Sequence, residues 1–135
     1  MSIHLETRDL INTQHMEVAV RGPDGATHLI LCTGIVCVDA LVHETYTFFV
    51  GPQLSQRQFV GAIASGALAA IQAYDQNLTD DNAKRAPEIN LVSIDANYDV
   101  EFGQVRVRAE VASTKVITKV GITYNVSILA ELPII

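Results

Sequence analysis

The sequence predicts an α+β fold in which a curved antiparallel sheet wraps one buried central helix. Three observations favour this class. Apolar and polar residues alternate in the first half and in the last third of the chain, which is the period of half-buried strands. Between them, Phe59 to Ile71 contains one polar side chain, Ser65, and a helix-capping pattern precedes it. The chain has 135 residues, 49% of them hydrophobic, which suits one domain over residues 1–135.

The first half predicts a hairpin followed by further strands. Residues 16–20 alternate as a strand, and the Gly-Pro-Asp-Gly sequence at 22–25 favours a turn. Residues 27–32 are expected to return as the hairpin partner. Gly34 then marks either a bulge or a second tight turn, before strand-like segments that continue to Val50.

The central helix is expected over about residues 56–76. Ser55 and Gln58 form a capping-box pattern, and Leu54 can pack on Phe59 as a hydrophobic staple. A helix without a polar face must be covered on all sides. Its apolar run is shorter than the ~20 residues that span a bilayer, so the cover is expected to be protein.

The C-terminal third predicts a β-meander of three strands. Residues 92–100 and 105–111 alternate on either side of a turn at 101–104. A final strand keeps one apolar face over 116–132, although ordinary strands run ~3–10 residues. We therefore expect it to bend at Gly121 or to extend beyond its own domain. The whole sheet then has about six or seven strands.

Composition and charge restrict the partners and the compartment. The net charge is −6 and no stretch is strongly basic, which argues against a nucleic-acid partner. The densest basic cluster, Arg106, Arg108, Lys115 and Lys119, is interrupted by Glu110 and is interpreted as the solvated face of a hairpin. No apolar run suggests a membrane span. Two cysteines cannot build a disulfide framework, so we expect reduced thiols and a cytoplasmic protein, or part of an assembly formed there.

Four residues are weak candidates for metal ligands: His28, Cys32, Cys37 and His43. If the chain turns near Gly34, the two cysteines could face each other. The paired-cysteine and helix-histidine spacings of zinc modules are absent, and buried free cysteines are far commoner. We therefore expect no metal and no cofactor.

Asp39, His43 and Glu44 are the weak candidates for acid–base catalysis. Asp39 and His43 are four residues apart, which places them on one face of a strand. No nucleophile motif of a hydrolase occurs in the chain. An enzyme is therefore the less favoured reading.

A long helix wrapped by a curved antiparallel sheet is similar to the hotdog fold of thioester hydrolases and dehydratases. This resemblance implies an alternative function: an enzyme that acts on an acyl thioester at a dimer interface, with Asp39, His43 or Glu44 as acid or base. The chain also resembles small phage capsid, neck and tail subunits, which are acidic α+β proteins with long strands that pair across subunits.

The leading hypothesis is a structural or assembly subunit of a symmetric homo-oligomer. It rests on the helix without a polar face, the very long last strand and the apolar C-terminal tail. The expected partners are further copies of the chain and other subunits of a larger assembly. The predicted interface residues are Gly61, Ser65 and Gly66 in the helix and Leu132, Ile134 and Ile135 in the tail.

Overall fold

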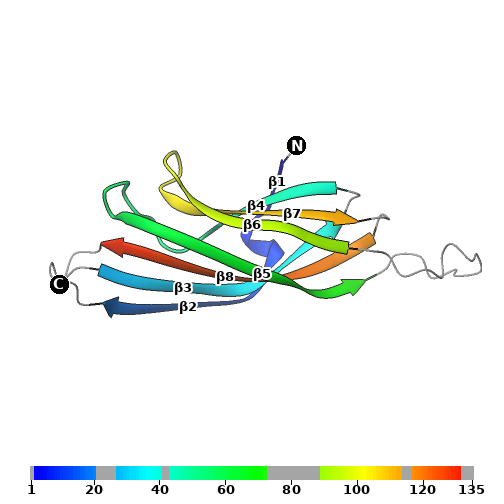
Figure 1. The fold of residues 1–135 in the computed structure, drawn as a ribbon, viewed down its shortest axis with the longest axis horizontal. Helices are drawn as coiled ribbons and strands as arrows, with labels where there is room; N and C mark the ends of the chain where they lie inside the picture. The colour runs from blue at the N-terminus through cyan, green and yellow to red at the C-terminus, as the bar shows by residue number, and fades with distance from the viewer. Residues whose placement is uncertain (1, 21–26, 41–42, 73–88, 114–116, 132–135) are drawn as a thin grey trace, which may run out of the picture.

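A computed structural model describes residues 2–20, 27–40, 43–72, 89–113 and 117–131 (Figure 1). Its elements are β1 (Ser2–His4), the 3₁₀ turn η1 (Thr7–Asp9), β2 (Leu10–Val20), β3 (Thr27–Ala40), β4 (His43–Val50), β5 (Phe59–Gln72), β6 (Ile89–Asp99), β7 (Gln104–Ser113) and β8 (Ile117–Glu131). Over these residues, no helix is long and apolar enough to cross a membrane.

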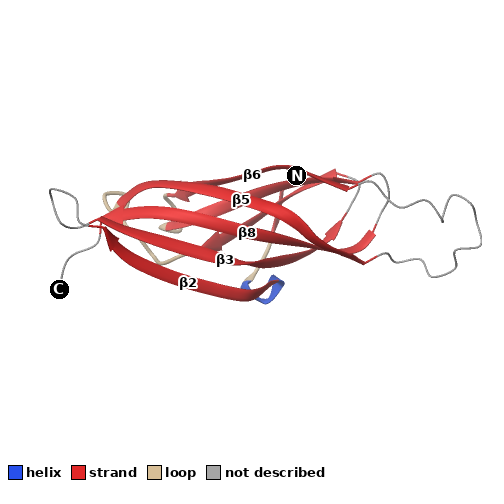
Figure 2. Cartoon of the chain, turned by 60° about the horizontal axis from the view of Figure 1, so that its bottom comes forward, coloured by secondary structure: helices blue, strands red, loops and turns tan. Residues whose placement is uncertain are grey.

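The described strands form two four-stranded sheets that pack face to face. Sheet I has the order β1-β4-β7-β6, and sheet II has the order β2-β3-β8-β5. Neighbouring strands are antiparallel, except that β1 is parallel to β4. The two sheets approach each other along one side, where β5 runs beside β6 (Figure 2). On the other side, the chain passes from β1 through η1 into β2.

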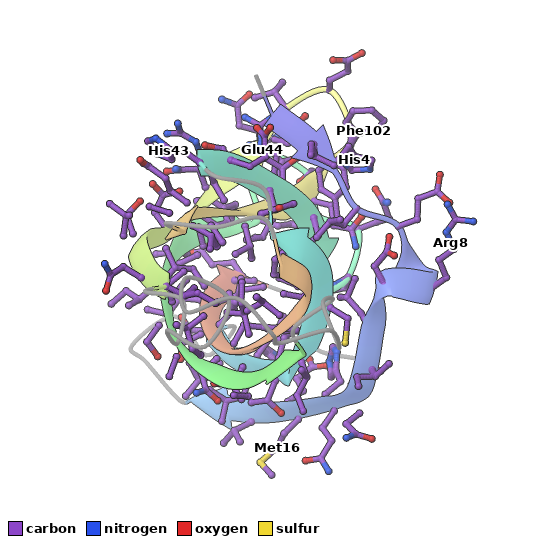
Figure 3. The ribbon with its side chains drawn as sticks, turned by 90° about the vertical axis from the view of Figure 1, so that its right-hand side faces the viewer. His4, Arg8, Met16, His43, Glu44 and Phe102 are labelled. Carbon is purple, nitrogen blue, oxygen red and sulfur yellow. The ribbon has the colours of Figure 1, made fainter. Side chains whose placement is uncertain are left out.

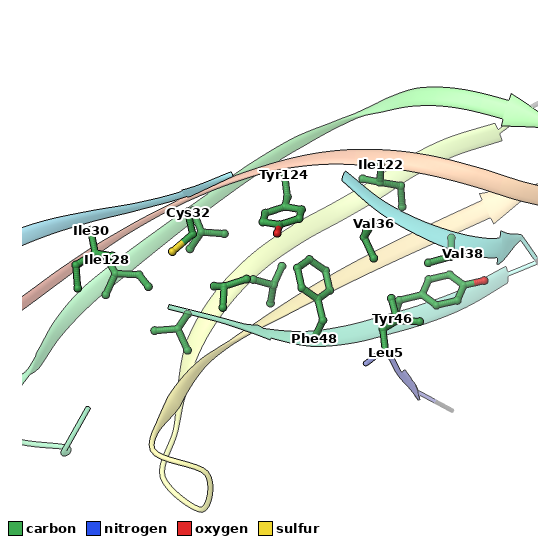
Figure 4. Packing of buried hydrophobic residues seen from close by; sticks show 14 of the residues in the cluster. Leu5, Ile30, Cys32, Val36, Val38, Tyr46, Phe48, Ile122, Tyr124 and Ile128 are labelled. Carbon is green, nitrogen blue, oxygen red and sulfur yellow. The ribbon is translucent and has the colours of Figure 1, made fainter. Parts of the chain in front are cut away.

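The core fills the space between the two sheets (Figure 4). Phe48 of β4 is fully buried, and its ring lies 5.1 Å from the ring of Tyr124 on β8. The predicted alternation of β7 is confirmed, because every second residue from Val105 to Val111 is buried. The same holds along β8 from Val120 to Ala130.

The predicted central helix over 56–76 is wrong, and with it the α+β class. The fold is two β-sheets, and residues 59–72 form β5. The capping pattern does make its local contact, since Ser55 N–H donates to Gln58 Oε1 at 2.8 Å. It closes a single turn, in which the N–H of Phe59 reaches back to the Ser55 carbonyl at 3.3 Å. The chain then becomes extended and pairs with β8.

Small side chains explain why this segment could be misread. Alanine, glycine and serine fit either period, so their pattern does not distinguish a helix from a strand. In β5 they alternate: Ser65 and Ala67 are exposed, whereas Gly66 and Leu68 point toward the core. A Cβ on Gly66 would lie 3.1 Å from Ile94 Cδ1 of β6. The small residues therefore permit close packing between strands.

The N-terminal hairpin is confirmed as β2 and β3, and its predicted turn at 22–25 lies outside the described residues. Gly34 is neither a turn nor a bulge, because β3 runs through it without interruption. The ring of Tyr124 lies across it, and a Cβ at Gly34 would be 2.5 Å from the Tyr124 hydroxyl. The register shift is in the neighbouring strand, between Ile11 and Gln14 of β2.

The hairpin predicted in the C-terminal third is confirmed as β6 and β7, and the long last strand as β8 with 15 residues. The three strands do not form a meander. β8 is not part of sheet I; it lies between β3 and β5 in sheet II. The strand is long because it pairs along most of its length with both neighbours within one domain.

Candidate functional site

The outer face of sheet II is the most unusual surface in the described part of the chain. Residues that pair across neighbouring strands point to the same side, so the ladders define rows across the sheet. Three rows are mainly apolar: Met16, Leu31, Ser127 and Ile63; Val18, Leu29, Leu129 and Gly61; and Ile11, Ile35, Thr123 and Ala67. The fourth row, Gln14, Thr33, Asn125 and Ser65, is polar. None of these residues carries a charge.

Several of these apolar side chains are exposed to solvent. Ile63 is 76% exposed and Met16 is 59% exposed. Figure 3 shows Met16 pointing away from the sandwich. Val18 and Leu129 are also exposed. An antiparallel sheet with one face in water normally carries polar residues on that face, so this surface departs from the usual pattern.

The outer face of sheet I has the opposite character. Arg106 and Arg108 of β7 are exposed, as the solvated-hairpin interpretation predicts. Arg106 Nη1 lies 3.3 Å from Asp99 Oδ2, and Arg108 is opposite Asp95 in the register. Charged groups therefore cover one side of the molecule, while the other side carries an uncharged face.

Three of the predicted interface residues lie in β5. Gly61 and Ser65 belong to the uncharged face, and their role in an interface remains a prediction. Gly66 lies on the inner side, opposite Tyr124. Leu132, Ile134 and Ile135 lie outside the described residues.

The catalytic candidates lie on two strands of different sheets. Asp39 belongs to β3 in sheet II, and its side chain is outside the described part; His43 and Glu44 belong to β4 in sheet I. The prediction that Asp39 and His43 share one strand is therefore wrong. His43 Nε2 contacts Glu110 Oε1 at 2.7 Å, and Glu44 Oε1 accepts the Thr45 N–H. Figure 3 shows both side chains on the side of the molecule opposite Met16.

The metal-ligand candidates are also dispersed. His28 and Cys32 lie on the inner side of β3, Cys37 lies on its outer side, and His43 is in the other sheet. His28 Nδ1 is buried and lies 2.8 Å from Glu17 Oε1, but it has no hydrogen-bond partner among the described residues. Among the described residues, no group of three or more His, Cys, Asp or Glu side chains could hold a metal ion.

A cavity of about 630 Å³ opens between the sheets, beside the β1–η1–β2 connection. Cys32 and Tyr124 line its interior, and Arg8 and His15 belong to its rim. Burial raises the pKa of the Cys32 thiol. Burial, followed by the nearby Cys32 thiolate charge, raises the pKa of Tyr124. His15 faces Cys32 in the register, but a thiol kept protonated is a poor nucleophile.

Met16 and Val18 are surface residues, which their sequence pattern did not predict. Their alternation correctly indicated a strand, and it implied that the apolar side faces the core. In the structure this side points outward, while His15 and Glu17 are on the inner side of β2. Alternation with a period of two distinguishes the two faces of a strand but does not show which face is covered. The available signal for an interface was that one face of several strands carries no charged residue.

Comparison with protein-family models, with curated protein sequences and with solved structures finds no match to this chain.

Proposed function

We propose that this chain is a structural or assembly subunit of a symmetric homo-oligomeric complex and acts through protein–protein contacts. Subunits of phage capsids, necks and tails are the example of such assemblies that the sequence analysis gives. The observation that carries the proposal is the group of four uncharged rows on the outer face of sheet II, three of which are mainly apolar. Apolar surface left in water costs about 25 cal/mol per Å², so an exposed face of this kind favours a partner.

The size of the face suits a protein partner. Four rows of alternate residues extend about 27 Å along the strands, and four strands extend about 19 Å across them. This gives roughly 500 Å² in projection. The next row on the same side contains the exposed Glu131, so the uncharged area ends there. Two copies in contact through it bury about 1,000 Å² in total, the lower limit of a specific interface.

A second copy of the chain is the partner that the charges favour. The chain carries a net charge of −6, so most contacts between copies bring like charges together. The uncharged face allows two copies to approach without this repulsion. Two-fold symmetric contacts of one surface with itself are the commonest arrangement in oligomers.

Assembly in the cytoplasm is part of the proposal. Cys32 and Cys37 are both free thiols, and unpaired cysteines are typical of reducing compartments. The alternative, a hotdog-like enzyme, depended on a central helix that the structure replaces with β5.

The test is the mass of the protein in solution, measured by light scattering at micromolar concentration. We expect a multiple of 14.7 kDa. Ile63→Lys places a charge in the first apolar row and is expected to weaken association by about tenfold or more. Asn97→Lys adds the same charge on the exposed outer face of sheet I and should leave the mass unchanged. A mass of 14.7 kDa at every concentration would refute the proposal.

A further inference from the structure

β2 is an edge strand of sheet II, and no other strand of the described residues pairs with its free edge. Its sequence, LINTQHMEVAV, contains no lysine, arginine or proline. Natural edge strands usually carry such residues, or a bulge, because an open edge pairs readily with other strands. β2 has the register shift between Ile11 and Gln14 and one charged residue on its inner side, Glu17, which is also a protective device. Residues 14–20 then pair regularly with β3 on one side, and 14–19 are exposed.

We infer that the free edge of β2 pairs antiparallel with β2 of a second copy, about a two-fold axis at Met16. The inference rests on the proposed function, because it assumes that the chain self-associates. To the proposed self-association it adds the strand that makes one contact, β2, the strand it pairs with, β2 of the second copy, and the register of the pairing. The outcome is a continuous eight-stranded sheet made of two copies of sheet II.

Geometry restricts the register to a few choices. In a continuous sheet, facing residues of an antiparallel pair lie on the same side. A two-fold axis perpendicular to the sheet therefore passes beside one central residue, which faces its own copy. Every other residue faces a partner residue whose number differs from its own by an even number. Within the regular segment, a centre at Val18 would place Glu17 opposite the partner's Ala19, which leaves His15, Met16 and Glu17 as the centres to compare by charge.

Charge selects Met16 among these three centres. With Glu17 at the centre, two carboxylates face each other, which is destabilising. With His15 at the centre, two imidazoles face each other. With Met16 at the centre, His15 faces the partner's Glu17, and Glu17 faces the partner's His15. An imidazole N–H then meets a carboxylate on both sides of the axis.

Both groups have the capacity for this contact. His15 is exposed and makes no hydrogen bond or ion pair with another described residue. The Glu17 side chain is 40% exposed, and its Oε1 contacts His28 Nδ1 at 2.8 Å. A carboxylate accepts about four hydrogen bonds, so Glu17 can bind the partner's His15 while it keeps His28.

The pairing also extends the uncharged outer face. In this register Gln14 faces the partner's Val18, and Met16 faces the partner's Met16. The apolar rows of the two copies therefore meet at the axis. Edge pairing doubles the face described above, on which further copies can assemble.

Cysteine cross-linking tests the register directly. At the axis, the two Cα atoms of Met16 should lie about 4.5–5.5 Å apart, within the range for a disulfide. Met16→Cys is therefore expected to form a covalent dimer under mild oxidation. Gln14→Cys is the matched control: it lies on the same exposed face, but its two copies are about 13 Å apart along the strands. The wild-type chain gives the background from Cys32 and Cys37.

A charge exchange tests the same contact without a covalent bond. His15→Glu makes carboxylates face each other at two places and should weaken the dimer by about tenfold. The double variant His15→Glu/Glu17→His restores the pairing and should recover most of this loss. Asn97→Glu adds the same charge on sheet I and serves as the control. Thermal melting of each variant checks that the monomer is folded.

The outcomes separate the two proposals. If the wild-type chain is a monomer at every concentration, both fail. If it is an oligomer but Met16→Cys cross-links no better than Gln14→Cys, the edge inference is wrong and the proposed function stands. The edge inference is also wrong if the double charge exchange recovers no association.

Discussion

Gly66 and Gly61 offer the sharpest test of β5, because both lie in the same strand with different surroundings. A Cβ added at Gly66 would lie 2.6 Å from the backbone oxygen of Thr123 and 3.1 Å from Ile94 Cδ1. A Cβ added at Gly61 would have no heavy atom within 4 Å. We therefore expect Gly66→Ala to destabilise the protein and Gly61→Ala to be tolerated.

The magnitude follows from these contacts. Ordinary van der Waals contact of a Cβ begins at 3.4 Å, so the atoms must separate by about 0.8 Å, which is 3.4 minus 2.6. The obstacle is the backbone of β8, which is hydrogen-bonded to strands on both sides. Overpacking of this kind costs about 1–3 kcal/mol, and removing a glycine from a strand recovers about 0.5–1 kcal/mol. The net loss for Gly66→Ala is then up to about 2.5 kcal/mol, and Gly61→Ala should gain up to about 1 kcal/mol.

The assay is thermal and denaturant unfolding of both variants beside the wild type. The expected loss corresponds to a fall in Tm of up to about 8 °C for Gly66→Ala. In a helix, both substitutions would stabilise the protein by about 1 kcal/mol, because alanine is the better helix former. A Gly66→Ala variant that melts at or above Gly61→Ala would therefore refute the close packing of β5 on β8.

Three further predictions concern the cavity and the sheet I surface. Gly34→Ala should lower the free energy of unfolding by about 1–3 kcal/mol, measured by urea denaturation, because the buried Tyr124 ring occupies the space of the new methyl group. Burial raises the pKa of Cys32 above its ordinary value of 9.0, so the unfolded thiol loses its proton first and stability should fall as the pH rises above 9.0. The free energy of unfolding should fall less steeply with pH for Cys32→Ala than for the wild type. The same slope in both proteins would contradict the burial effect. His43→Ala removes an exposed contact with Glu110 and should change stability by less than about 1 kcal/mol in the same urea assay.

The sequence alone determined the strands whose alternation combines large apolar residues with charged ones. In β7, each valine is followed by an arginine or another outward residue, so the period and the direction are both clear. The length of β8 was also visible, because its apolar face continues without a break over most of the strand. The β2–β3 hairpin followed from alternation on both sides of a turn sequence. In these segments, local preference and burial agree.

The tertiary structure decided the segments where local signals are weak. Ser55 and Gln58 make the predicted capping contact, but one turn does not commit the following alanines and glycines to a helix. The ladder with β8 supplies the backbone partners that make β5 a strand. The orientation of β2 was likewise not a local property, because alternation distinguishes two faces without saying which is covered. Sheet I does not cover the inner side of β2 near Glu17, and the apolar side that carries Met16 faces outward. The candidate interface therefore exists only where four strands, distant in sequence, bring their uncharged residues to one side.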